Sequence, residues 1–111
     1  MAEETLAFRM VLKPGFADEY RRRHDAIWPD LRSALLDAGV IDYRIFLDDE
    51  TLHLFAVLTR RADHGMDALP SLPVMRRWWD MMADIMETHP DASPAQQALT
   101  PMFHLSSEEH G

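Results

Sequence analysis

Two side chains that can exchange protons lie one helical turn apart in residues 20–31, YRRRHDAIWPDL. His24 follows Tyr20 by four residues, so a helix places both on the same face. The same face carries three aliphatic residues, Ile27, Leu31 and Leu35. An imidazole titrates near neutral pH, so a His24 that faces inward can act as a general acid or base. Taken alone, a histidine on an apolar face is more often a hydrogen-bonded core residue, and both interpretations stay open at this point.

Three more aromatic side chains could complete a binding site around this histidine. Tyr43 lies on the apolar face of a predicted strand, and Trp78 and Trp79 are neighbours in a predicted helix. Aromatic faces with hydroxyl and indole N–H donors suit a sugar, whose ring has apolar C–H faces and a polar rim. Neighbouring residues of a helix diverge by about 100°, so both tryptophans reach one site only at a helix edge or in a pocket. By itself, such a pair more often serves packing.

The composition argues against several other chemistries. The chain has no cysteine, so it has no disulfide, thiol nucleophile or thiolate metal site. Its six histidines include no pair four residues apart, and its four glycines are isolated, so neither a metal motif nor a phosphate-binding loop is evident. No serine lies in a nucleophile elbow. We therefore expect no metal and no cofactor.

Length and charge limit the partners. With 111 residues the chain fits one domain, residues 1–111. Its net charge of -8 would repel a phosphate backbone, so we expect no nucleic-acid partner. No apolar run approaches the roughly 20 residues that cross a bilayer, so we expect no membrane partner. The acidic start, MAEETLAF, lacks the basic and apolar regions of a signal peptide, which favours a cytoplasmic location.

Hydrophobic periodicity predicts the first half of the fold. Residues 5–13 alternate with a period of two, which predicts a strand. A helix follows, and Pro29 must kink or restart it after Asp25, because proline has no N–H to donate and clashes with the preceding turn. We expect Asp25 to cap the second half of the helix, residues 29–38, and Gly39 to end it.

The second half of the sequence predicts a hairpin, a helix and a final strand. Residues 40–47 and 52–58 alternate on either side of a polar turn, so they form a β-hairpin. An apolar stripe at helical spacing then marks residues 74–86 as a helix. Beyond it we expect a loop, one helical turn over residues 94–99 and a short strand over residues 102–105.

The order of elements is therefore βαββαβ, which fits an α+β, ferredoxin-like βαββαβ sandwich with one antiparallel sheet and two helices on one face. The other face of such a sheet stays bare. Four apolar residues would lie on it: Val11, Phe46, Phe55 and Val57. A second copy that packs sheet to sheet would cover them, which predicts a homodimer. A monomer with a partly apolar sheet surface is the alternative.

Four segments together resemble L-rhamnose mutarotases over nearly the whole chain. They are EYRRRHDAIWPDL, DYRIFLD, RRWWDMM and HPDASP. The resemblance implies a dimeric α+β barrel made by two ferredoxin-like subunits. It also implies that the chain interconverts the α and β anomers of L-rhamnose, an isomerase reaction that needs no cofactor.

The same resemblance assigns roles to five residues. The proton-donating histidine of the family falls on His24, as the acid that would protonate the ring oxygen of the sugar. The residues that contact the sugar fall on Tyr20, Tyr43, Trp78 and Trp79. Asp25, next to the histidine, is expected to raise the pKa of His24 through its charge. It is also a candidate for the group that takes the anomeric proton.

Two other functions remain compatible with these residues. A cofactor-free oxygenase on the same dimeric barrel could use an aromatic pocket with one histidine. A non-catalytic sugar-binding module could use His24 only as a hydrogen-bond donor. Exchange between the two anomeric proton signals of L-rhamnose distinguishes a mutarotase from both.

Overall fold

The computed structural model describes residues 2–107; Met1 and residues 108–111, with His110 among them, lie outside the described part. Four strands form one antiparallel sheet in the order β2-β3-β1-β4. Their bounds are Glu3–Val11 for β1, Val40–Leu47 for β2, His53–Arg61 for β3 and Gln97–Ala98 for β4.

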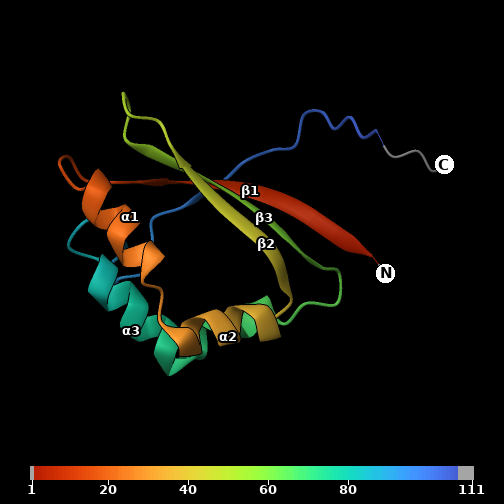
Figure 1. Cartoon of the computed structure of the whole chain (residues 1–111), viewed down its shortest axis with the longest axis horizontal. Helices are drawn as coiled ribbons and strands as arrows, with labels where there is room; N and C mark the ends of the chain where they lie inside the picture. Colours follow the sequence, from red (N-terminus) through yellow and green to blue (C-terminus); the bar gives the residue numbers. More distant parts are fainter. Residues whose placement is uncertain (1, 108–111) are drawn as a thin grey trace.

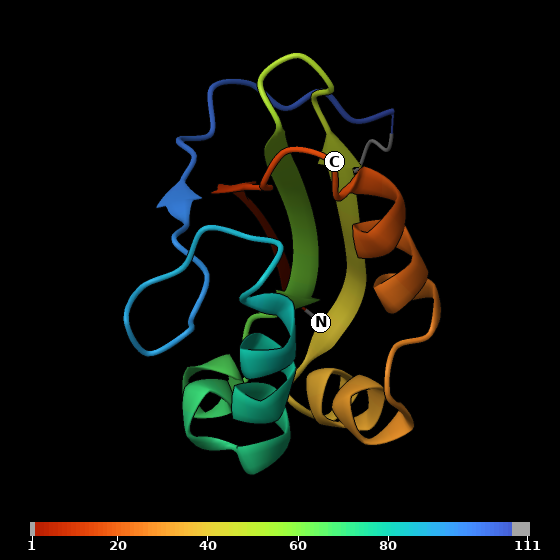
Figure 2. The same cartoon turned by 90° about the vertical axis from the view of Figure 1, so that its left-hand side faces the viewer.

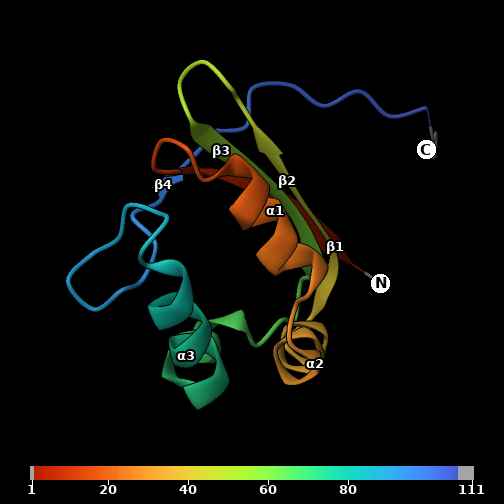
Figure 3. The ribbon, with the colours of Figure 1, turned by 60° about the vertical axis from the view of Figure 1, so that its left-hand side comes forward.

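Three α-helices and one 3-10 helix accompany the sheet in the described chain. Their bounds are Ala17–Asp25 for α1, Pro29–Asp37 for α2, Met66–Ser71 for the 3-10 helix η1 and Pro73–Met82 for α3. All three α-helices lie on the same side of the sheet (Figures 1 and 3). No helix within residues 2–107 has the length and apolarity to span a membrane. The element order and the strand order confirm the predicted ferredoxin-like fold.

The first helical segment breaks where the proline predicts a break. α1 ends at Asp25, and Pro29 opens α2, where its missing N–H would have no helical partner in any case. Trp28, the residue before the proline, is extended, with φ -64° and ψ 134°. The expectation that Asp25 caps α2 is wrong, because Asp25 still belongs to α1 and no side chain caps α2. Gly39 adopts φ 114°, a conformation that favours glycine, and ends α2 as expected.

The predicted hairpin is confirmed. β2 and β3 pair from Val40 with Arg60 to Leu47 with Leu54. The apolar residues on the inner face of the sheet point toward the helices and form the core with them. The most deeply buried members from the strands are Leu54, Ala56 and Leu58. Removal of this apolar surface from water holds the helices against the sheet.

The C-terminal segment departs from the expected helical turn. Residues 94–99 run extended, and β4 pairs with the edge of β1 through Phe8 and Ala98. The amide of Leu99 also donates to the carbonyl oxygen of Ala7, at 3.0 Å. Figure 2 shows β4 as the short blue arrow at the rim of the sheet. The expectation of a helical turn is wrong. The edge of β1 lies far away in the sequence, and its backbone groups form hydrogen bonds with this segment when the segment is extended.

The expected strand over residues 102–105 is also wrong. Met102, Phe103 and Leu105 are 88%, 85% and 82% exposed, and residues 102–105 belong to no strand of the described chain. In Figure 1 the chain beyond β4 runs as an extended blue trace toward the C-terminus, away from the helices. Alternating apolar residues form a strand only where a neighbouring strand offers hydrogen bonds, and this segment has none beside it.

The face of the sheet that points away from the helices carries the expected apolar residues. Phe46 is 56% exposed and Val57 is 36% exposed on this face, while Val11 and Phe55 are half-buried. Arg9 lies among them, opposite Phe55 in the register of β1 and β3. No α-helix covers this outer face (Figure 3).

Candidate active site

A large cavity opens between the helices and the inner face of the sheet. Its volume is about 1200 Å³, somewhat above the range of about 300–1,000 Å³ that is common for small-molecule sites. The lining includes all five predicted site residues: Tyr20, His24, Tyr43, Trp78 and Trp79. The fold therefore brings together side chains from α1, β2 and α3. Within residues 2–107, no group of three or more His, Asp or Glu side chains is placed to hold a metal ion.

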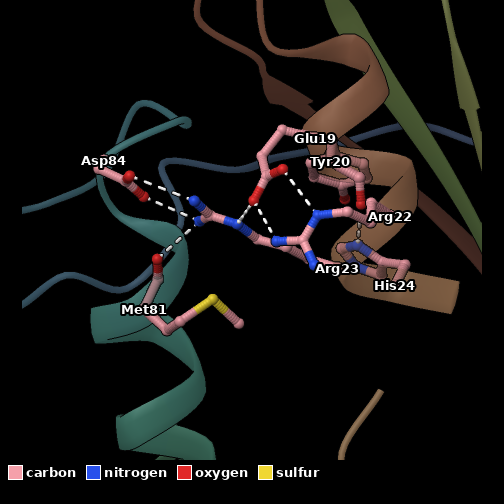
Figure 4. A network of polar contacts seen from close by, with 7 residues as sticks. All are labelled: Glu19, Tyr20, Arg22, Arg23, His24, Met81 and Asp84. Atoms are coloured by element: carbon pink, nitrogen blue, oxygen red, sulfur yellow. Dashed lines mark hydrogen bonds and ion pairs between the residues drawn. The ribbon is translucent and has the colours of Figure 1, made fainter. Parts of the chain in front are cut away.

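His24 lies in the last turn of α1, and its ring is held in one orientation. Its Nδ1 lies 3.0 Å from the backbone carbonyl oxygen of Tyr20, one turn earlier (Figure 4). A carbonyl oxygen can only accept, so Nδ1 carries the hydrogen and, in the neutral ring, Nε2 is the acceptor. The imidazole also stacks on the ring of Tyr20, with 4.2 Å between centroids. The backbone of α1 thus selects the tautomer that leaves Nε2 available for proton exchange.

Burial lowers the pKa of His24 below its usual value of 6.5. The hydrogen bond to the Tyr20 carbonyl and the negative charge of Asp25 both raise this pKa, but by less. Asp25 therefore acts in the predicted direction, whereas the net shift of the His24 pKa is opposite to the expected one. Desolvation outweighs the neighbouring charge because Asp25 is exposed to water, which screens it. At neutral pH the imidazole is uncharged.

Both tyrosines of the site keep their protons at neutral pH. Tyr20 is 9% exposed; burial raises its pKa, and the nearby Tyr43 raises it further. Burial raises the pKa of Tyr43 to about 12, although water reaches 38% of its surface through the open cavity. The ring of Tyr43 lies near that of Phe8, with 6.4 Å between centroids. The two phenols are therefore neutral hydrogen-bonding groups on opposite walls of the cavity, one from a helix and one from the sheet.

The two adjacent tryptophans both reach the cavity. Trp78 is 6% exposed and meets the ring of His24 edge to face, with 5.3 Å between centroids. Trp79 is half-buried and lines the same cavity. Trp28, which no sequence pattern predicted as a site residue, packs edge to face against Trp78 at 5.2 Å. Trp28 does not line the cavity, so it contacts Trp78 on a side of that ring that faces away from the cavity. Its place in the EYRRRHDAIWPDL segment was the one available signal.

A polar network links α1 to the end of α3 (Figure 4). Nε of Arg23 binds Glu19 at 2.6 Å, and Nη1 donates to the carbonyl oxygen of Met81 at 2.8 Å. The same guanidinium binds Asp84 at 2.9 Å. Arg22 also binds Glu19. The four-residue spacing of Glu19 and Arg23 is a sequence signal for their pairing in a helix, whereas the contact with Asp84 depends on the fold.

Known proteins that are similar to this chain in sequence include L-rhamnose mutarotases. The family model described as L-rhamnose mutarotase matches residues 5–105. An L-rhamnose mutarotase of Paraburkholderia phymatum is 68% identical over 102 residues, which cover 92% of this chain and 94% of that protein. An L-rhamnose mutarotase of Burkholderia cenocepacia is 65% identical over 102 residues, with 92% of this chain and 98% of that protein covered.

Solved structures agree with the sequence matches. The crystal structure of an L-rhamnose mutarotase from Formosa agariphila matches with a TM-score of 0.86 at 42% identity and covers 93% of this chain and 99% of its own. A putative antibiotic biosynthesis monooxygenase from Nitrosomonas europaea matches with a TM-score of 0.60 at 10% identity, covering 87% and 86%. At this low identity the second likeness concerns the fold alone.

Proposed function

This chain belongs to the L-rhamnose mutarotase family, and from that premise we propose that His24 carries the acid–base chemistry of the reaction. The activity is the interconversion of the α and β anomers of L-rhamnose, an isomerisation. One observation supports the assignment most strongly. Nδ1 of His24 is held by the carbonyl oxygen of Tyr20, and the ring lines a cavity with aromatic walls, where Nε2 can meet a sugar.

Mutarotation requires proton transfers but no redox change. The anomeric hydroxyl loses its proton, the bond between C1 and the ring oxygen breaks, and the ring oxygen gains a proton, which gives the open-chain aldehyde. Rotation about the C1–C2 bond presents the other face of the carbonyl to the hydroxyl. The same steps in reverse then close the ring. Atoms and charges balance with a general acid and a general base alone.

A single imidazole can serve both proton transfers. Nε2 of the neutral ring is an acceptor, so it takes the proton of the anomeric hydroxyl first. The imidazolium then donates this proton to the ring oxygen, which is bonded to the same carbon and so lies close to the first oxygen. His24 is thus the acid toward the ring oxygen, and Asp25 is not required as the base. One positioned acid–base group typically contributes about 10²- to 10⁴-fold in rate.

We assign the binding of the sugar to Tyr20, Tyr43, Trp78 and Trp79. The two phenols can donate hydrogen bonds to sugar oxygens because a phenol is protonated at neutral pH, and burial raises the pKa of both further above that range. The indole rings suit the apolar C–H faces of the pyranose. Trp79 is more exposed than Trp78 and therefore offers more of its surface to a ligand.

We further propose that two copies of this chain form a homodimer, a dimeric α+β barrel closed sheet to sheet. The outer face exposes Phe46 and Val57, and Nε of Arg9 is buried there without a hydrogen-bond partner in the described chain. A second copy would bury this apolar surface and could supply an acceptor to Arg9.

A cytoplasmic location is compatible with the lack of cysteine. We propose no nucleic-acid or membrane partner and no cofactor.

Exchange spectroscopy on L-rhamnose tests the role of His24. Wild-type protein should transfer magnetisation between the α and β anomeric protons. His24→Asn should slow this exchange by about 10²-fold or more at saturating sugar. His53→Asn is the matched control, because His53 lies beside Phe55 and outside the cavity. It should keep the wild-type rate, provided that light scattering shows the wild-type mass, since His53 lies on the face proposed to form the dimer. A His24→Asn variant that binds the sugar and exchanges its anomers at the wild-type rate would falsify the assignment.

A further inference from the structure

α1 carries Tyr20 and His24, yet its backbone does not pack closely against the other elements. No Cα atom of α1 lies within 8 Å of a Cα atom in another helix or strand of the described chain. Figure 3 shows α1 in front of the sheet and separate from α3. Side chains must therefore determine where α1 stands relative to the cavity.

Two kinds of side-chain contact join α1 and α3. His24 and Trp78 meet edge to face, and Tyr20 belongs to the same apolar core as Trp78. Apolar contacts of this kind exclude water but are not directional. The guanidinium of Arg23 is different, because it is planar and its donors point in fixed directions.

Arg23 uses these donors to bind both helices at once (Figure 4). Within α1, Nε binds Glu19. Toward α3, Nη1 donates to the carbonyl oxygen of Met81, and Nη1 and Nη2 bind the two carboxylate oxygens of Asp84 at 2.9 and 3.3 Å. Met81 lies in the turn of α3 that follows Trp78. One guanidinium therefore connects α1 to the part of α3 that carries the wall of the cavity.

The two ends of the ion pair between Arg23 and Asp84 differ in their exposure to water. The side chain of Asp84 is 64% exposed, and partly exposed ion pairs contribute little to the free energy of unfolding. The side chain of Arg23, in contrast, is only 14% exposed, so its carboxylate partners offset the cost of burying its charge. Hydrogen bonds from Arg22 and Arg23 lower the pKa of Glu19 to about 2, and Arg23 holds the pKa of Asp84 below its usual value. Both carboxylates therefore stay charged at neutral pH.

We propose that Arg23 is a positioning residue for mutarotation, whose contacts with Glu19, Met81 and Asp84 set the separation of α1 and α3 and thereby place His24 against the sugar. The inference rests on the role proposed above for His24. Arg23 itself does not line the cavity. Its loss should therefore slow the chemical step far more than it weakens the binding of L-rhamnose.

The first test compares Arg23 with its neighbour. Arg23→Met removes every donor but keeps the apolar stem, and it should slow anomer exchange at saturating L-rhamnose by about 10- to 100-fold, since a displacement near 1 Å can cost that much. The dissociation constant of the sugar should stay close to that of the wild type. Arg22→Met is the matched control: it also removes a partner of Glu19, but Arg22 makes no contact with α3 in the described network. Arg23→Lys should recover little of the lost exchange rate, because one ammonium group cannot reproduce the several fixed donor directions of the planar guanidinium.

A second measurement does not depend on activity. The ring of His24 lies edge to face with Trp78, so the NMR shifts of its ring protons report the ring current of the indole. Arg23→Met should change these shifts, and Arg22→Met should leave them unchanged. Asp84→Asn weakens the contact of Arg23 with the residues at the end of α3 and leaves the sequence of α1 unchanged. It should slow anomer exchange and change the His24 ring-proton shifts, both by less than Arg23→Met does. This second variant decides the matter if Arg23→Met does not fold.

Several results would overturn the positioning role. One is a wild-type exchange rate in Arg23→Met or Asp84→Asn with unchanged His24 shifts. Another is an equal loss of rate in Arg22→Met, because Arg22 does not reach α3. His24→Asn in the same assay separates the two proposals. Wild-type exchange in His24→Asn refutes the acid–base assignment, whereas a loss there together with wild-type exchange in Arg23→Met refutes only the role of Arg23.

Discussion

Nδ1 of His24 lies 3.0 Å from the backbone carbonyl oxygen of Tyr20, and the two rings stack one turn apart on α1. This relationship sets the tautomer of the imidazole through a main-chain atom, which no substitution of the Tyr20 side chain removes. The same placement buries the ring and lowers its pKa. A short stretch of helix thus prepares one nitrogen, Nε2, to take a proton at neutral pH.

The lowered pKa of His24 predicts the pH dependence of the rate. The neutral imidazole is the starting base, so protonation of the ring at low pH removes activity. Because burial places this pKa below 6.5, the exchange rate should fall with a midpoint below pH 6.5. NMR exchange rates from about pH 5 to pH 8, with the spontaneous rate in buffer subtracted, measure this midpoint. A midpoint at or above pH 6.5 would contradict the prediction.

The two tyrosines should resist ionisation in the folded protein. Burial raises the pKa of Tyr43 to about 12, and burial together with the nearby Tyr43 raises the pKa of Tyr20. The chain contains 2 tyrosines, so phenolate absorbance reports on these residues alone. We expect little phenolate absorbance near pH 10, where a free phenol is about half ionised. Urea-unfolded protein provides the control, and half-ionisation of the folded protein near pH 10 would argue against buried phenols.

Trp78→Ala and Trp79→Ala should differ in stability although both should weaken sugar binding. Trp78 is 6% exposed and packs against His24 and Trp28, so its truncation should cost about 3–5 kcal/mol of the free energy of unfolding. Trp79 is half-buried, and its truncation should cost less. Urea denaturation measures the free energy of unfolding of each variant, and titration with L-rhamnose measures its affinity for the sugar. Unchanged sugar affinity in both variants would rule out their role as cavity walls.

Phe46→Glu should dissociate the proposed homodimer. Phe46 is 56% exposed on the outer face, and a carboxylate there would be buried without a partner if two sheets pack together. Light scattering should give about twice the chain mass of 12.8 kDa for the wild type and the chain mass for the variant. Leu36→Glu is the control, because Leu36 is 42% exposed on α2, on the other side of the sheet. A wild-type mass near 12.8 kDa would refute the dimer.

Local patterns in the sequence determined most of the elements and the pairing of the first two site residues. The proline at position 29 alone predicted the break between α1 and α2, because a missing N–H acts on its own turn of helix. The spacing of Tyr20 and His24 placed both rings on one face, since helix geometry depends only on neighbours along the chain. The motifs around these residues were also sufficient to indicate the family.

Contacts between distant segments decided the rest. β4 is extended because it meets the edge of β1, which residues 94–99 do not encode by themselves. The pKa of His24 moves down because the fold buries the ring, and the adjacent Asp25 alone suggested the opposite direction. Arg23 and Asp84 are 61 residues apart, so no local periodicity could predict their contact. Burial, edge pairing and the spacing of helices are properties of the packed chain, and they exist only once the whole core has formed.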